Sequence, residues 1–168
     1  MDTQKYLMEM VDTFRAVDEP IVLVVFGDHK PWLGNGNSVY DALGVDLSQD
    51  TQESFYDYWS TRYLIWANDA AKEALGRDLK GEGPDISPCF LMNVLFEQLG
   101  WKGDAYMQAV ESCRQVLPAI HGSGACLTAD GRLVREPSEE QAETIRRFLS
   151  LGYHRIHHFS GRRDSAGP

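Results

Sequence analysis

The feature that most constrains the fold is an unbroken apolar run at residues 21–26, Ile-Val-Leu-Val-Val-Phe, which leads directly into Gly27, Asp28 and His29. Apolar and polar residues do not alternate along this run, so it predicts a strand buried on both faces of a parallel sheet. Ligands of open α/β sheets collect beyond the carboxyl ends of such strands. Here that end carries a carboxylate beside an imidazole, after a glycine that lets the backbone turn freely.

Asp28 and His29 supply the oxygen and nitrogen donors that Zn²⁺ or Mn²⁺ accept. The same residue types also suit a local role, in which Asp28 caps the following turn and His29 simply lies in it. Their spacing alone does not establish a metal site, because short motifs often match by chance.

The composition excludes several classes of protein. The chain has 168 residues, 43% of them hydrophobic, which predicts one globular domain. A net charge of −9 argues against nucleic acid as the partner. It leaves room for an anionic substrate, since a bound metal supplies local positive charge. Neither a signal peptide nor a membrane-spanning run is present, so we expect the chain by itself to be soluble.

Cysteine spacing indicates neither a disulfide framework nor a zinc ribbon. Cys89, Cys113 and Cys126 are scattered and lack C-x-x-C spacing. We expect them to act as small buried hydrophobic residues.

Local signals predict a mainly helical chain with few strands. A second apolar strand is expected at residues 63–67, followed by a helix that Asn68 or Asp69 caps and that ends near Gly76. Asp130-Gly131 indicates a hairpin within residues 125–134. Further helices are predicted over residues 3–17, 38–43, 52–59, 87–99, 104–118 and 137–159. Two buried strands are too few for a covered sheet, which suggests an unusual small fold or the end of a larger sheet.

Two segments together resemble a known family. Residues 24–31 read Val-Val-Phe-Gly-Asp-His-Lys-Pro, and residues 61–68 read Thr-Arg-Tyr-Leu-Ile-Trp-Ala-Asn. They are similar to the F-G-D-H-x-P and T-P-x-x-I-W-x-N motifs of the lipoteichoic acid synthase-like phosphoglycerol transferases, which belong to the sulfatase/alkaline phosphatase superfamily. Arg62 replaces the proline of the family pattern. Weaker similarity continues through residues 86–99 and ends in Tyr153, Ile156, Phe159 and Gly161.

The resemblance implies an α/β fold, namely the carboxyl-terminal part of an alkaline phosphatase/sulfatase-like three-layer domain. It covers nearly the whole chain but only that part of the family domain, with residues 1–160 in the domain and residues 161–168 as a flexible tail. By the resemblance, Asp28 and His29 bind a divalent metal, Mn²⁺ or Mg²⁺. The implied parent activity is phosphoglycerol transfer, or hydrolysis of a phosphoester or sulfoester. Its substrate would be a lipid head group or a glycerophosphate polymer, and the parent enzyme would be membrane-anchored with this domain on the outer face.

The same resemblance implies that catalytic residues are missing from this chain. The family's nucleophilic threonine and an acidic metal ligand lie upstream of the matched segment, and no threonine here has a matching context. The C-x-P-x-R signature of sulfatases is absent too. We therefore expect an incomplete metal site and an inactive isolated chain. The alternative is a non-catalytic binding or interaction module, in which unpaired sheet edges favour self-association.

Two further groups of residues have an ordinary structural explanation. His154, His157 and His158 would share one face of a helix, where they could hold a transition metal. A solvated helix end is favoured, because no acidic or cysteine ligand accompanies them. Trp32 and Trp66 could line a site, but aromatic residues beside apolar strands usually belong to the core.

Overall fold

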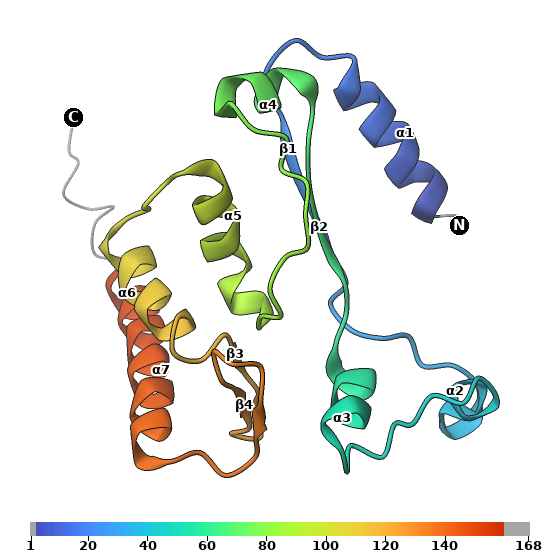
Figure 1. Cartoon of the computed structure of the whole chain (residues 1–168), viewed down its shortest axis with the longest axis vertical. Coiled ribbons are helices and arrows are strands. Elements are labelled where there is room, and N and C mark those ends of the chain that lie inside the picture. The colour runs from blue at the N-terminus through green and yellow to red at the C-terminus, as the bar shows by residue number, and fades with distance from the viewer. Residues whose placement is uncertain (1–2, 160–168) are drawn as a thin grey trace. The chain divides into compact units, whose positions relative to one another are not determined.

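The computed structural model describes residues 3–159 (Figure 1). The chain divides into two compact units, residues 1–82 and residues 83–168. Each unit combines helices with a small antiparallel sheet, so the fold is α/β in the general sense. Among the described residues, no helix has both the length and the apolar character that a membrane span requires.

Unit 1 is built around a two-stranded ribbon of β1 (Val22–Phe26) and β2 (Tyr63–Ala67). The helices α1 (Thr3–Arg15) and α4 (Asp69–Leu75) lie at one end of this ribbon. The short helices η1 (Asn35–Asn37) and α2 (Ser38–Ala42), together with α3 (Gln52–Trp59), follow from the other end (Figure 1). The long connection between the paired strands therefore carries three of the unit's helical segments.

The prediction of a parallel strand buried on both faces is wrong. β1 and β2 are antiparallel, in a register that runs from Val22 opposite Ala67 to Phe26 opposite Tyr63. The first four residues of β1 are half-buried, and Phe26 is 55% exposed. An apolar run specifies burial of its side chains but not the direction of the neighbouring strand, which here comes from a chain reversal through α2 and α3.

Capping interactions set the limits of the helices in unit 1. Thr51 and Ser54 form a reciprocal capping box at the start of α3, so the predicted limits of that helix are confirmed. Asn68 caps α4, and Gly76 ends it in the left-handed conformation at φ 64°. Of the two caps proposed for α4, the structure therefore selects Asn68.

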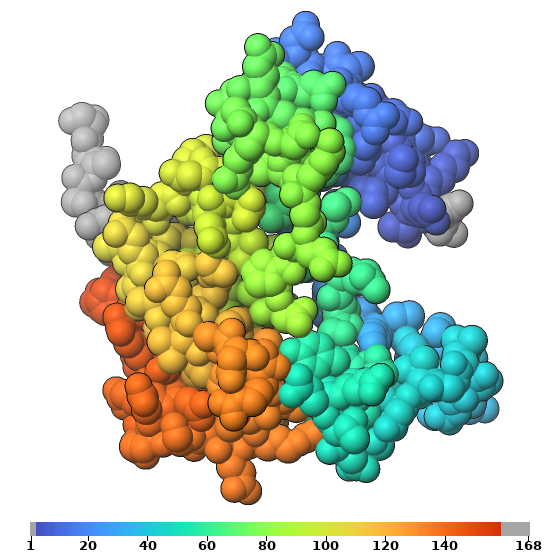
Figure 2. Space-filling model, viewed as in Figure 1, coloured from blue at the N-terminus to red at the C-terminus, as the bar shows by residue number. Residues whose placement is uncertain are grey.

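Unit 2 consists of a group of mutually packed helices and a three-stranded sheet. Its elements are η2 (Pro88–Phe90), α5 (Leu91–Leu99), α6 (Ala105–Arg114), β3 (Ala119–Ile120), β4 (Cys126–Leu127), β5 (Leu133–Val134) and α7 (Glu139–Phe159). The predicted hairpin is confirmed as β4 and β5, while β3 is an additional antiparallel strand beside β4. Figure 2 shows the atoms of α5, α6 and the strands of this unit, in yellow to orange, as a continuous surface.

The core of unit 2 consists of apolar side chains that are almost completely buried. Its most buried side chains include Phe90, Val94, Val110 and Leu117. The ring of Phe90 lies 5.1 Å from that of Phe148 on α7, a tilted aromatic pair. Cys113 and Cys126 are buried as predicted, whereas the prediction of burial is wrong for Cys89, which is exposed in the short helix η2.

Candidate metal site

The candidate site begins where β1 ends, at Gly27. The amide of Gly27 donates to the carbonyl oxygen of Arg62 at 3.0 Å, which extends the β1–β2 ladder by one pair. The Thr61 hydroxyl donates to the Gly27 carbonyl oxygen at 2.7 Å. A Cβ atom at residue 27 would lie 3.0 Å from the Cβ of Thr61. Gly27 therefore allows this close approach of Thr61 and does not, as expected, make a special backbone turn, since its φ is not positive.

Asp28 and His29 follow directly and project into solvent. Their side chains are 82% and 77% exposed, respectively. One carboxylate oxygen of Asp28, Oδ1, accepts the backbone N–H of His29 at 2.9 Å. The ring nitrogen Nδ1 of His29 lies 3.0 Å from the carbonyl oxygen of Lys30. The side chain of Asp28 is thus engaged locally, by the backbone amide of the next residue.

This local role leaves one donor atom of each side chain directed at the other. Oδ2 of Asp28 and Nε2 of His29 are 3.6 Å apart. A metal–ligand bond to such atoms is about 2.0–2.2 Å long, so one ion fits in contact with both. The contact of Nδ1 with a backbone carbonyl also favours the tautomer that leaves Nε2 available as a ligand. The pair therefore has donor atoms that suit a divalent metal, and the same two residues form the turn.

The residues after His29 anchor this turn to both neighbouring helices. The ammonium group of Lys30 donates to the carbonyl oxygen of Asp57 on α3. The hydroxyl of Tyr40 on α2 donates to the carbonyl oxygen of Pro31 at 2.9 Å. Together with Thr61, these contacts hold the backbone on each side of Asp28 and His29. The side chains of Asp28 and His29 are exposed, but these contacts hold the backbone of the turn in place.

The two tryptophans near the turn have different environments. Trp66 is half-buried on β2, whereas Trp32 is 70% exposed, so the prediction that Trp32 belongs to the core is wrong. Trp32 lies in the segment between β1 and η1, outside any helix or strand.

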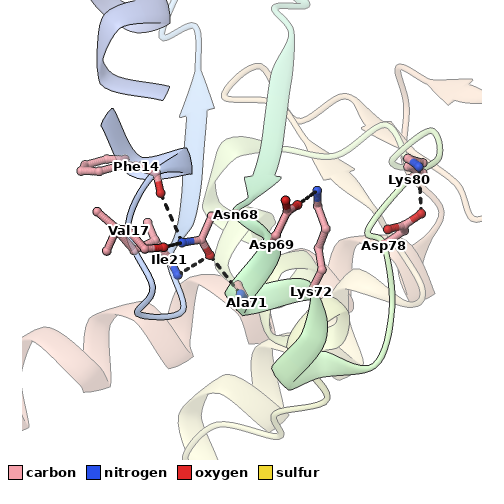
Figure 3. A network of polar contacts seen from close by, with 9 residues as sticks. All are labelled: Phe14, Val17, Ile21, Asn68, Asp69, Ala71, Lys72, Asp78 and Lys80. Carbon is pink, nitrogen blue, oxygen red and sulfur yellow. Dashed lines mark hydrogen bonds and ion pairs between the residues drawn. The ribbon is translucent and has the colours of Figure 1, made fainter. Parts of the chain in front are cut away.

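The second motif ends in a buried polar centre at Asn68, which is 1% exposed (Figure 3). Its Oδ1 atom accepts two backbone amides, from Ile21 at 3.0 Å and Ala71 at 2.9 Å. Its Nδ2 atom donates to three carbonyl oxygens, those of Phe14 at 3.2 Å, Val17 at 3.0 Å and Glu19 at 2.8 Å. Asn68 therefore joins the end of α1, the start of β1 and the cap of α4.

The threonine hydroxyls of the described chain are mostly engaged in structural hydrogen bonds. Thr61 binds Gly27, and Thr51 caps α3. The remaining bonded hydroxyls belong to Thr13, which donates to Glu9, Thr144, which donates to Glu140, and Thr128, which donates to Asp130. None of these five is directed at Asp28 or His29.

The three histidines of α7 do not gather into one cluster. The ring centroids of His154 and His158 lie 4.2 Å apart in a tilted pair, while the ring of His157 lies 4.0 Å from that of Tyr153. All three are exposed near the end of the helix, as predicted for a solvated terminus. Between residues 3 and 159, no group of three or more His, Cys, Asp or Glu side chains is placed to hold a metal ion. Asp28 and His29 are thus two ligands that would need others to complete a site.

Two supports of the turn were not predicted. The contact of Thr61 with Gly27 joins residues of the two motifs. Only the presence of both motifs in one sequence could have indicated it. The contact between Lys30 and the Asp57 carbonyl has no signal, because it depends on where α3 returns to the ribbon.

No protein-family model, curated protein or solved structure matches this chain.

Proposed function

We propose that this chain is the carboxyl-terminal portion of a sulfatase/alkaline phosphatase-like three-layer domain. Within it, Asp28 and His29 contribute two ligands to a divalent metal, Mn²⁺ or Mg²⁺. The parent activity is metal-dependent phosphoglycerol transfer, or hydrolysis of a phosphoester or sulfoester. The substrate class is a lipid head group or a glycerophosphate polymer.

One observation carries the proposal. The two motifs that resemble the family, far apart in the sequence, form one ribbon and meet at Thr61 and Gly27. The residues that match the family pattern thus lie together at one turn, which presents a carboxylate and an imidazole 3.6 Å apart. If the two motifs had matched the family by chance, nothing would require them to be neighbours.

Each group at the turn has a defined role in this proposal. A bound divalent ion would polarise a phosphoryl or sulfuryl oxygen and favour attack by an oxygen nucleophile. The Asp28 carboxylate and the neutral His29 ring hold the ion, while Gly27, Thr61 and Lys30 keep the turn in place. The nucleophile and the remaining ligands come from outside these residues, so we expect no turnover by this chain alone.

Calorimetric titration of the full chain with Mn²⁺ tests this function. We expect weak binding that is lost in both Asp28→Asn and His29→Gln, because the one ligand that remains in each variant is too few to hold the ion. Asp50→Asn, which removes an exposed carboxylate elsewhere in unit 1, serves as the matched control and should bind like the parent chain.

Three results would contradict the proposal. Absence of any Mn²⁺ or Mg²⁺ binding would remove the metal site, and equal loss of binding in Asp50→Asn would indicate nonspecific attraction to a chain of charge −9. Rapid cleavage of a generic phosphodiester by the full chain would contradict the claim that the nucleophile lies outside this chain.

A second candidate function is a non-catalytic interaction module. It is favoured by the ribbon itself, which has apolar side chains on both faces and no third strand among residues 3–159. A chain that binds no metal but associates through this ribbon would support this second function instead of the first.

A further inference from the structure

The outer edge of β1 carries backbone groups without partners. In the β1–β2 ladder, Gly27 pairs with Arg62 and Ile21 with Asn68 through direct hydrogen bonds. Hydrogen-bonded pairs alternate along an antiparallel ladder, so residues 21, 23, 25 and 27 direct their N–H and C=O groups toward β2. Val22, Val24 and Phe26 direct theirs to the opposite edge. Within the described residues, no backbone hydrogen bond reaches that edge.

This edge lacks the features that normally prevent strand pairing. β1 reads Val-Leu-Val-Val-Phe and contains no charged residue, proline or glycine. Phe26, at its end, is largely exposed. A two-stranded ribbon is marginally stable in water, and three or more strands with an apolar face are usually needed. The outer edge of β2 is less open, because Ala67, one of its three outward-directed residues, is buried.

The charges that flank β1 favour one partner, a second copy of the same strand. Asp18 precedes the strand, whereas Lys30 follows it. If two copies of β1 are antiparallel and centred on Val24, Asp18 of one copy lies opposite Lys30 of the other. By the two-fold symmetry, an acidic and a basic side chain therefore meet at both ends of the pairing, which favours this orientation.

We propose that the chain forms a symmetric dimer through β1, with the two-fold axis at Val24. Val22 of each copy pairs with Phe26 of the other, and the two Val24 residues pair with each other. All three outward-directed residues then exchange backbone hydrogen bonds with their opposite residues, without any change in the β1–β2 register. The result is a four-stranded antiparallel sheet with β2 strands at its edges. This inference does not rest on the metal site.

Sedimentation of the full chain over a range of concentrations tests the dimer. We expect the mass to approach twice 18.9 kDa as concentration rises. In Val24→Lys two like charges would face each other across the axis, so this variant should remain monomeric. Ile65→Lys is the matched control, because Ile65 lies opposite Val24 on the same face of the ribbon but on the strand away from the interface. It should dimerise like the parent chain.

A cysteine cross-link tests the register without relying on disruption of the fold. Hydrogen-bonded residues opposite each other in an antiparallel pair have Cα atoms about 5.5 Å apart, which a disulfide spans. In a Cys89→Ala background, which removes the exposed native thiol, Val24→Cys should form a covalent dimer on oxidation. Ile65→Cys should not.

A parent chain that stays monomeric at every concentration would overturn the proposal. So would a Val24→Lys variant that dimerises like the parent, or a dimer in which Val24→Cys fails to cross-link. The last result would place any association on another surface.

Discussion

The hydroxyl of Thr61 donates a hydrogen bond of 2.7 Å to the carbonyl oxygen of Gly27, and this contact joins the end of β1 to the start of β2. It lies directly before Asp28, the first candidate metal ligand. The side chain of Thr61 also occupies the space that a Cβ at residue 27 would need. Position 27 and position 61 are therefore constrained by each other.

Replacement of Gly27 by alanine should destabilise unit 1. The added Cβ would approach the Cβ of Thr61 to 3.0 Å, and neither atom lies at the flexible end of a side chain. Overpacking of this kind costs about 1–3 kcal/mol. Urea unfolding measures the loss, and a variant as stable as the parent would show that the two backbones separate without cost.

The hydrogen bond of the Thr61 hydroxyl can be tested separately from the packing of the Thr61 side chain. Thr61→Val retains the branched side chain but removes the hydrogen bond, so it should lower the free energy of unfolding by roughly 1 kcal/mol. Thr61→Ser keeps the hydroxyl and is the matched control, with a smaller loss expected. The opposite order of stability would indicate that packing of the Thr61 methyl group dominates.

Replacement of Asn68 by alanine should be the most damaging polar substitution in unit 1. It leaves the backbone groups that Asn68 joins without their partner, at a buried position (Figure 3). Loss of the α4 cap and of these buried hydrogen bonds predicts a cost of roughly 3 kcal/mol. Urea unfolding measures this cost, and hydrogen exchange should show loss of protection at the end of α1.

Asp69 provides the control for Asn68. Its exposed carboxylate accepts a hydrogen bond from Lys72 at 2.9 Å, and this bond holds the pKa of Asp69 below its ordinary value. An exposed ion pair contributes little to folding, so Asp69→Ala should unfold at nearly the same urea concentration as the parent. Equal damage from both variants would contradict the special role of Asn68.

Unit 2 should lose stability in acid partly through Asp104. This residue caps α6, and the backbone N–H of Met107 and then the nearby Arg155 hold the pKa of its carboxyl below the ordinary value of 3.8. Because the folded pKa is the lower one, the stabilisation is complete above the unfolded pKa. It is lost as the pH falls through the folded pKa.

Asp104→Asn isolates this pH dependence. Asparagine caps helices about as well as aspartate but does not titrate in this range. We expect the difference in unfolding free energy between the parent and the variant to shrink as the pH falls below about 4. A difference that is independent of pH between neutral and acidic solution would show that the charge of Asp104 is irrelevant.

Local chemistry explains which parts of the fold were predictable. The limits of α3 follow from the Thr51 capping box, and the ends of α4 and α5 follow from Gly76 and Gly100, both left-handed in the structure. These signals act within one helical turn. The direction of β2 relative to β1 depends on the path of the chain through α2 and α3, and the apolar run contains no information about it. β3 is two residues long and has no pattern of its own.

The residues of the candidate site could be predicted from the sequence, but the contacts that hold them in place could not. Asp28 and His29 could be proposed because a carboxylate and an imidazole follow an apolar strand. Their exposure, the contact between Oδ2 and Nε2, and the anchoring of Lys30 on α3 depend on tertiary structure. The role expected for Gly27 was wrong because a glycine can be required by a neighbour's side chain as well as by its own φ angle.

The most direct test of the metal site is paramagnetic broadening by Mn²⁺ in the NMR spectrum of the full chain. Substoichiometric Mn²⁺ should broaden the amide signals of Asp28, His29 and Lys30 first, and this selectivity should be lost in Asp28→Asn but kept in Asp50→Asn. If broadening instead centres on other carboxylates, or is unchanged in Asp28→Asn, then Asp28 and His29 do not form a metal site.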